Sequence, residues 1–173
     1  MWLIVATIPL KWLPTIALPS AYDYYLTQAK TSPAIIPDQL LVHPDFMYES
    51  VQPTWTVILF APPDVCNSYF IMHVVVEQNG MALAYASNYL RDDPTIAMTA
   101  IGQNWQALQL ASWRLRDDQD FILTAVAQNG RALQFASPRL RANFNVALAA
   151  LRNNRDSLCF ASERMQRLLG GQN

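Results

Sequence analysis

The side chains that could do chemistry in this sequence are paired carboxylates, two histidines and two cysteines. Asp92-Asp93 and Asp117-Asp118 each place two acids side by side, with Asp120 close behind. Such pairs serve general acid–base catalysis when both groups converge on one pocket. Both pairs stand just before segments with helical patterning, where N-capping and the helix dipole favour acids. We therefore expect a capping role for them.

The histidines and cysteines do not form a metal or nucleophile motif. His43 and His73 are too few for a metal site, and His73 is expected on a helix surface or in the core. Cys66 and Cys159 lie far apart in the chain, so we expect no disulfide and two buried, inert thiols. The sequence has no glycine-rich phosphate loop and no nucleophile elbow. We expect a protein that is not an enzyme, with no catalytic, cofactor-binding or metal-binding residues.

The composition indicates a covered surface. The chain has 173 residues, of which 52% are hydrophobic and only 14% are charged, whereas an ordinary domain has about 25% charged residues. A partner protein, a membrane face or both would cover such a surface, although alanine-rich repeats also raise the apolar fraction. The formal net charge of −1 provides no basic excess, so nucleic-acid binding is set aside.

The strongest pattern is an internal repeat of 25 residues between about residues 68 and 167. An alanine–serine pair recurs at this spacing, and so does a leucine three residues before each alanine. The pairs are Ala86-Ser87, Ala111-Ser112, Ala136-Ser137 and Ala161-Ser162, and the leucines are Leu83, Leu108, Leu133 and Leu158. A period of this length is typical of stacked supersecondary units.

Two apolar stripes with helical spacing predict two helices in each unit. The first stripe follows a column of N-cap residues, namely Ser68, Asp93, Asp118 and Asn143. It ends at a column of asparagines, Asn79, Asn104, Asn129 and Asn154, which we expect in the left-handed conformation that closes many helices. Gly80 and Gly130 add stop-and-turn signals. The second stripe, beginning with Ala82 and Leu83, predicts a shorter helix.

These patterns predict an all-α fold, a short α-solenoid of helix-turn-helix repeats. Leucine-rich repeats also have periods near 25 residues, but they need an asparagine or cysteine ladder after a strand, which is missing here. The repeated serines could line a ligand-binding row. We expect instead that each hydroxyl satisfies a backbone carbonyl at a helix end.

Residues 1–42 are predicted to be a hydrophobic, proline-containing arm and linker, extended except for one short helix before His43. Residues 43–67 read as a degenerate first repeat, residues 68–169 as the repeat array and residues 170–173 as a tail. Segment 1–19 fits docking on a protein or on the repeats, and it fits a membrane surface with its tryptophans at headgroup depth. A targeting signal or a membrane span is also open, although Lys11 and three prolines count against a span.

Several stretches resemble the helical repeat family called domain of unknown function 4116, over about residues 68–167. They are Leu90-Arg91-Asp92-Asp93, Leu115-Arg116-Asp117-Asp118, Asn129-Gly130-Arg131-Ala132-Leu133 and Phe135-Ala136-Ser137. The resemblance implies a helical scaffold without established catalytic residues. It also implies a source among protists, algae or bacteria that secrete such proteins.

We expect a non-catalytic, protein-binding scaffold that serves as an accessory subunit of a larger assembly. A membrane-bound photosynthetic or respiratory complex of a protist is one expected setting, with the chain at the periphery of an organelle membrane. The alternative is a soluble adaptor or a secreted bacterial effector that grips a partner through its repeats. The candidate partner contacts are Trp2, Trp12, Trp105 and Trp113.

The leucine column gives a first prediction. If Leu133 is a core residue, Leu133→Ala should lower the free energy of unfolding by about 2–5 kcal/mol, because it removes buried methyl groups and leaves a cavity. Urea denaturation measures this change. A loss below about 0.5 kcal/mol, the range of ordinary surface substitutions, would contradict the assignment of this column to the core.

Overall fold

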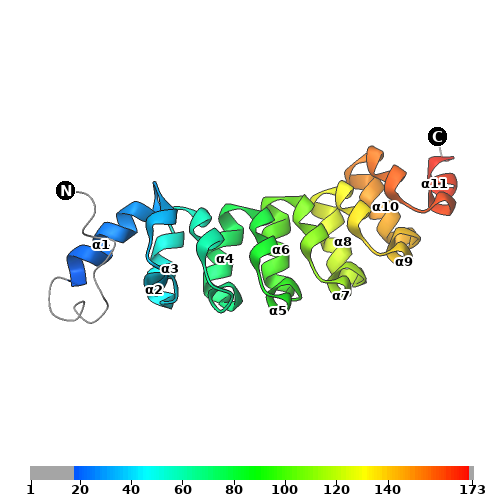
Figure 1. Cartoon of the computed structure of the whole chain (residues 1–173). Coiled ribbons are helices and arrows are strands. Elements are labelled where there is room, and N and C mark those ends of the chain that lie inside the picture. Colours follow the sequence, from blue (N-terminus) through cyan, green and yellow to red (C-terminus); the bar gives the residue numbers. More distant parts are fainter. Residues whose placement is uncertain (1–17, 172–173) are drawn as a thin grey trace.

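The computed structural model describes residues 18–171, and every regular element in this range is a helix. The helices form an elongated row that runs from α1 (Leu18–Ala29) to α11 (Glu163–Gly170) (Figure 1). The prediction of an all-α fold is confirmed. Because residues 18–171 contain no strand, the leucine-rich-repeat alternative is excluded for this part of the chain.

Each unit of the row consists of a long helix, a 3₁₀ helix and a short helix. In the four units after residue 68 the long helix has ten residues and the following 3₁₀ helix has six. The elements are η3 (Pro33–Ile35), α2 (Asp38–Leu41), α3 (Pro44–Val51), η4 (Trp55–Phe60), η5 (Val65–Asn67), α4 (Tyr69–Gln78), η6 (Gly80–Tyr85), α5 (Asn88–Arg91), α6 (Pro94–Gln103), η7 (Trp105–Leu110), α7 (Trp113–Arg116), α8 (Gln119–Gln128), η8 (Gly130–Phe135), α9 (Pro138–Arg141), α10 (Phe144–Asn153) and η9 (Arg155–Phe160).

The second apolar stripe of each unit is not the single helix that was predicted. In the unit of α4 it is divided at Ala86, whose backbone is extended at φ −66° and ψ 149°. The residues before it form a 3₁₀ helix with i→i+3 bonds, and Ser87 then begins the short helix α5. The apolar spacing could not distinguish these two segments from one α-helix.

The asparagine column also behaves differently from the prediction. Asn79 has φ −148° and ψ 105°, which is extended backbone and not the left-handed conformation. Its side-chain Oδ1 accepts a hydrogen bond from the N–H of Met81 at 3.0 Å. Asn104, Asn129 and Asn154 accept equivalent bonds from Gln106, Arg131 and Asp156. These asparagines therefore begin the 3₁₀ helices, in the manner of N-caps.

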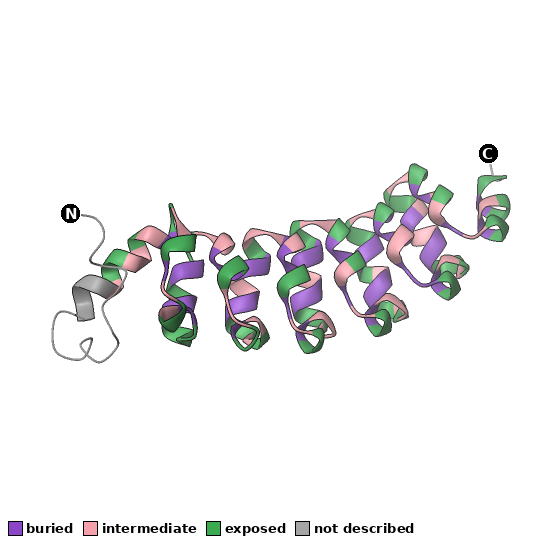
Figure 2. Cartoon of the chain, viewed as in Figure 1, coloured by how far each residue is buried: buried purple, intermediate pink, exposed green. Residues whose placement is uncertain are grey.

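The long helices α4, α6, α8 and α10 pack side by side, and so do the 3₁₀ helices that follow them. Leu83, Leu108 and Leu133 are completely buried between these two layers, as the sequence predicted. The alanines of the repeated pairs, Ala86, Ala111, Ala136 and Ala161, are also buried. The inner faces of the long helices are buried along the whole row, whereas the edge of short helices is mostly exposed (Figure 2).

Residues 20–42 contain more helix than was predicted. The short helix α2 agrees with the one helix expected before His43, but α1 lies where an extended linker was predicted. Tyr22 on α1 packs edge-to-face on Phe46 of α3, with ring centroids 5.3 Å apart, and its hydroxyl donates to Glu49 at 3.1 Å. Leu41 of α2 is buried as well. The prediction of an extended linker was wrong because α1 folds against α3, a tertiary contact that the prolines and tyrosines of this segment do not reveal.

The predictions for the hydrophobic segment 1–17, including Trp2 and Trp12, lie outside the described residues. Among the helices that the structure does describe, none has the length and apolar character needed to cross a membrane.

Gly80 and Gly130 are required by close packing between neighbouring units. A Cβ on Gly80 would lie 2.1 Å from the carbonyl oxygen of Ala100, and one on Gly130 would lie 2.6 Å from that of Ala150. The N–H of Gly80 donates to Oε1 of Gln103 on the next long helix at 2.6 Å. These glycines let a 3₁₀ helix approach the backbone of the following unit directly.

This close approach predicts opposite effects for two glycine substitutions. Gly80→Ala should lower the free energy of unfolding by about 1–3 kcal/mol, because the added methyl group overlaps a backbone carbonyl. Gly102→Ala is the matched control. Its Cβ would meet only Oε1 of Gln128, at 3.9 Å, so it should raise the free energy by about 0.5–1 kcal/mol. Urea denaturation of both variants tests the pair, and equal effects would contradict the packing.

Candidate partner-binding edge

The short helices α5, α7, α9 and α11 stand along one edge of the row, at the ends of the units (Figure 1). We define this short-helix edge as residues 87–93, 112–118, 137–143 and 162–167. It carries the serines of the alanine–serine pairs, the acid pairs and most of the arginines of the chain.

The serines connect neighbouring units along this edge. The N–H of Ser112 donates to the carbonyl of Arg91 at 2.9 Å, and Ser137 donates in the same way to Arg116. The Oγ atoms of Ser87, Ser112 and Ser137 each accept the N–H of the leucine three residues later, for example that of Leu140 at 3.2 Å. The serine is therefore an N-cap whose backbone bridges two units. The predicted bond from its hydroxyl to a carbonyl at its own helix end is not formed.

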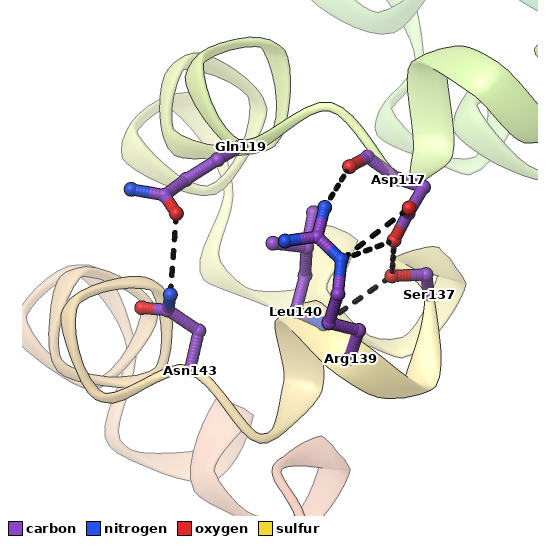
Figure 3. Close-up of polar contacts among 6 residues, drawn as sticks. All are labelled: Asp117, Gln119, Ser137, Arg139, Leu140 and Asn143. Atoms are coloured by element: carbon purple, nitrogen blue, oxygen red, sulfur yellow. Dashed lines mark hydrogen bonds and ion pairs between the residues drawn. The ribbon is translucent and has the colours of Figure 1, made fainter.

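An aspartate of one unit is held by a serine and an arginine of the next (Figure 3). The hydroxyl of Ser137 donates to Oδ1 of Asp117. Arg139 donates through Nε to the same carboxylate at 3.1 Å and through Nη2 to the backbone carbonyl of Asp117 at 2.5 Å. We call this arrangement a rung. Ser112 and Arg114 hold Asp92 in an identical rung, with Nε 2.9 Å from the carboxylate.

The rungs lower the pKa of both carboxyl groups. For Asp92 the main cause is the hydrogen bond from Ser112, and the guanidinium of Arg114 adds to it. For Asp117 the same two causes come from Ser137 and Arg139. Because these pairs are solvent-exposed, each contributes little to overall stability. Their clear effect is to hold charged side chains in fixed positions along the edge.

A second arginine column, Arg91, Arg116 and Arg141, follows the rungs. The Nε atoms of all three are buried and have no hydrogen-bond partner among residues 18–171. The guanidinium of Arg116 lies 5.7 Å from the ring of Trp113, a distance that allows a cation–π interaction.

Two of the predicted tryptophan contacts have different surroundings. Trp113, on the short-helix edge, is 59% exposed. Trp105 of η7 is half-buried and stacks on Phe135 of η8, with centroids 5.8 Å apart. Trp113 is therefore available to a partner, whereas Trp105 fills the junction between two units.

The sequence analysis missed other exposed aromatic side chains. Tyr89 on the short-helix edge is 74% exposed, and its position in neighbouring units holds Arg114 and Arg139. Phe70 is 73% exposed. It lines a shallow groove together with Tyr48, Tyr69, His73 and Val74. Both aromatics could have been found, since each interrupts a column that is polar in other units.

The side chains considered for catalysis have the following surroundings in the described part of the chain. Residues 18–171 contain no group of three or more His, Cys, Asp or Glu side chains that could hold a metal ion. Asp93 and Asp118 cap their helices through Oδ1, as predicted. Both cysteines are free. Cys66 is half-buried, and burial raises the pKa of its thiol. Cys159 is exposed, so the prediction that it is buried was wrong.

The stacked units and the repeated rungs place this chain among the helical repeat proteins. Two stretches, residues 67–116 and 118–166, match the family described as Domain of unknown function (DUF4116). Because these stretches cover more than half of the sequence, the chain belongs to this family, as the resemblance indicated. No curated protein and no solved structure matches it.

The rungs predict a specific pH dependence. A carboxylate whose pKa is lowered by folding stabilises the protein above its ordinary pKa, near 4, and this contribution is lost as the pH falls through the lowered value. Replacing Asp92 and Asp117 by asparagine removes that contribution. The stability advantage of the wild type over this double variant should therefore be present at pH 6 and shrink towards pH 3.

Urea denaturation at several pH values between 6 and 3 measures this difference. The control is Asp120→Asn, which removes a carboxylate that is outside the rungs. A wild-type advantage that stays constant down to pH 3 would contradict the role assigned to the rungs.

Proposed function

We propose that this chain is a non-catalytic, protein-binding α-solenoid with a 25-residue unit, and that it serves as an accessory subunit of a larger assembly. The architectural part is supported by the four ten-residue helices that begin at Tyr69, Pro94, Gln119 and Phe144. It is also supported by the hydrogen bond from a serine backbone N–H to a carbonyl of the preceding unit, which recurs at each junction. In such an array each unit contacts only its neighbours, so the outer side chains are free to serve recognition.

The observation that carries the functional part is the exposure of Tyr89 and Trp113 on one edge. Truncating a large aromatic side chain at an interface removes apolar contact with the partner. Tyrosine, tryptophan and arginine dominate the residues that contribute most to binding free energy. The arginines Arg114 and Arg139 stand on the same edge and are held in place by their rungs. An edge that presents aromatic and guanidinium groups suits a protein surface.

We place the assembly at a membrane as a further part of the proposal. Its support is the low charge content of the chain and the hydrophobic sequence of residues 1–19, which would contact lipid or a membrane-bound subunit.

The test is quantitative co-purification from the source cell with a tagged chain. The double variant Tyr89→Ala, Trp113→Ala should recover at least tenfold less partner protein than the wild type. Each ring is expected to supply about 2 kcal/mol or more of the binding free energy. Tyr24→Ala is the matched control. It removes a ring that is 44% exposed on α1, away from the short-helix edge.

Circular dichroism should show equal helicity for both variants and the wild type. Unchanged recovery with the double variant would refute the edge as the binding surface. If the wild-type chain is recovered as a monomer without any partner, the subunit proposal fails.

A further inference from the structure

The last rung of the short-helix edge is incomplete. The N–H of Ser162 donates to the carbonyl of Arg141 at 2.9 Å, as at the other junctions. The residue that corresponds to Asp92 and Asp117 is Ala142, an exposed alanine. Its backbone, at φ −96° and ψ 0°, closely matches that of Asp92, at φ −95° and ψ −4°. The rung therefore keeps its backbone geometry and lacks only the carboxylate.

The groups that hold the carboxylate in the other rungs are still present. Ser162 and Arg164 occupy the positions of Ser137 and Arg139. The Oγ of Ser162 is buried and has no hydrogen-bond partner within the described part of the chain. It also caps no backbone N–H of α11, unlike the serines of the preceding units. A buried hydroxyl without a partner is costly. Because the residue Ser162 is itself only partly buried, rotation about its Cα–Cβ bond would bring the hydroxyl to a carboxylate at the surface.

We propose that Ser162 and Arg164 form a binding site for a carboxylate that belongs to an acidic segment of a partner protein. This proposal rests on the binding function proposed above and names the chemistry of the partner. The preceding rungs show the expected mode of binding. In both of them a hydroxyl and a guanidinium bind one carboxylate together, and such charge-assisted bonds are strong and directional.

The charge distribution favours an acidic partner at this end of the row. Residues 121–171 contain seven arginines and only two acidic residues, Asp156 and Glu163. Residues 18–90 contain six acidic residues and one lysine. The formal net charge of −1 hides this separation, which is why composition alone gave no sign of it. The basic end would attract an acidic segment and orient it, although Glu163 beside the site opposes this attraction locally.

The structure offers a variant that fills the site from within. Ala142→Asp would supply the missing carboxylate to Ser162 and Arg164, so it should raise the unfolding temperature and block binding. Arg164→Ala should weaken binding without filling the site. Arg152→Ala is the control for overall charge, because it removes another exposed arginine from the same basic region.

The experiment titrates the chain with a capped hexaglutamate peptide, with acetate and with inorganic phosphate. NMR follows the backbone amide signals of residues 162–165 in every variant and, where Arg164 is present, its side-chain Nε–Hε signal. Acetate and the peptide should both shift this signal. The peptide should bind at least tenfold more weakly to Ala142→Asp and to Arg164→Ala, and within about twofold of the wild type to Arg152→Ala.

Equal binding of the peptide to Ala142→Asp and to the wild type would overturn the proposal. A larger response to phosphate than to the carboxylates would also overturn it, since a phosphate ligand would then be favoured. The two proposals are separable. If co-purified partners are retained by Ala142→Asp, only the carboxylate site is refuted. If the purified chain binds the peptide as expected but no partner co-purifies from the source cell, only the subunit proposal is refuted.

Discussion

Burial of one unit's apolar face against the next is the interaction on which this structure depends. Leu83, Leu108 and Leu133 are fully enclosed between the long helices and the 3₁₀ helices, and each such side chain contributes about 1.5–3 kcal/mol through burial. A unit of this size cannot bury its apolar face by itself, so each one requires a neighbour. The exposed side chains of the short-helix edge then have little part in stability, and they are free to differ between units.

The junctions between neighbouring units are packed in two different ways. Gly80 and Gly130 allow direct approach of one unit's backbone to the next. Trp105 occupies the corresponding position of the unit between them and stacks its ring on Phe135. Each of the two stretches matched by the family contains one of the glycine junctions. The family's own unit of about fifty residues therefore coincides with a pair of closely packed helical units.

Variation along the short-helix edge is where recognition is expected to lie. Where a rung is complete, as between Asp117 and Arg139, the two charges pair with one another. Where a rung is incomplete or a repeated residue is replaced, the side chain at that position does not take part in such a pair. Tyr89 stands in place of an arginine, and Ala142 leaves Ser162 and Arg164 without an aspartate. The differences between the repeats are thus more informative about binding than their similarities.

The sequence by itself determined the helical class, the family, the helix N-caps such as Asp93 and the buried leucine column. These features depend on local periodicity and on capping, which involve residues that are close together in the sequence. It did not determine the 3₁₀ conformation after Asn79, the folding of residues 20–42 or the rungs of the short-helix edge. These depend on contacts with the neighbouring unit, such as that between Asp117 and Arg139, and only the tertiary structure brings such partners together.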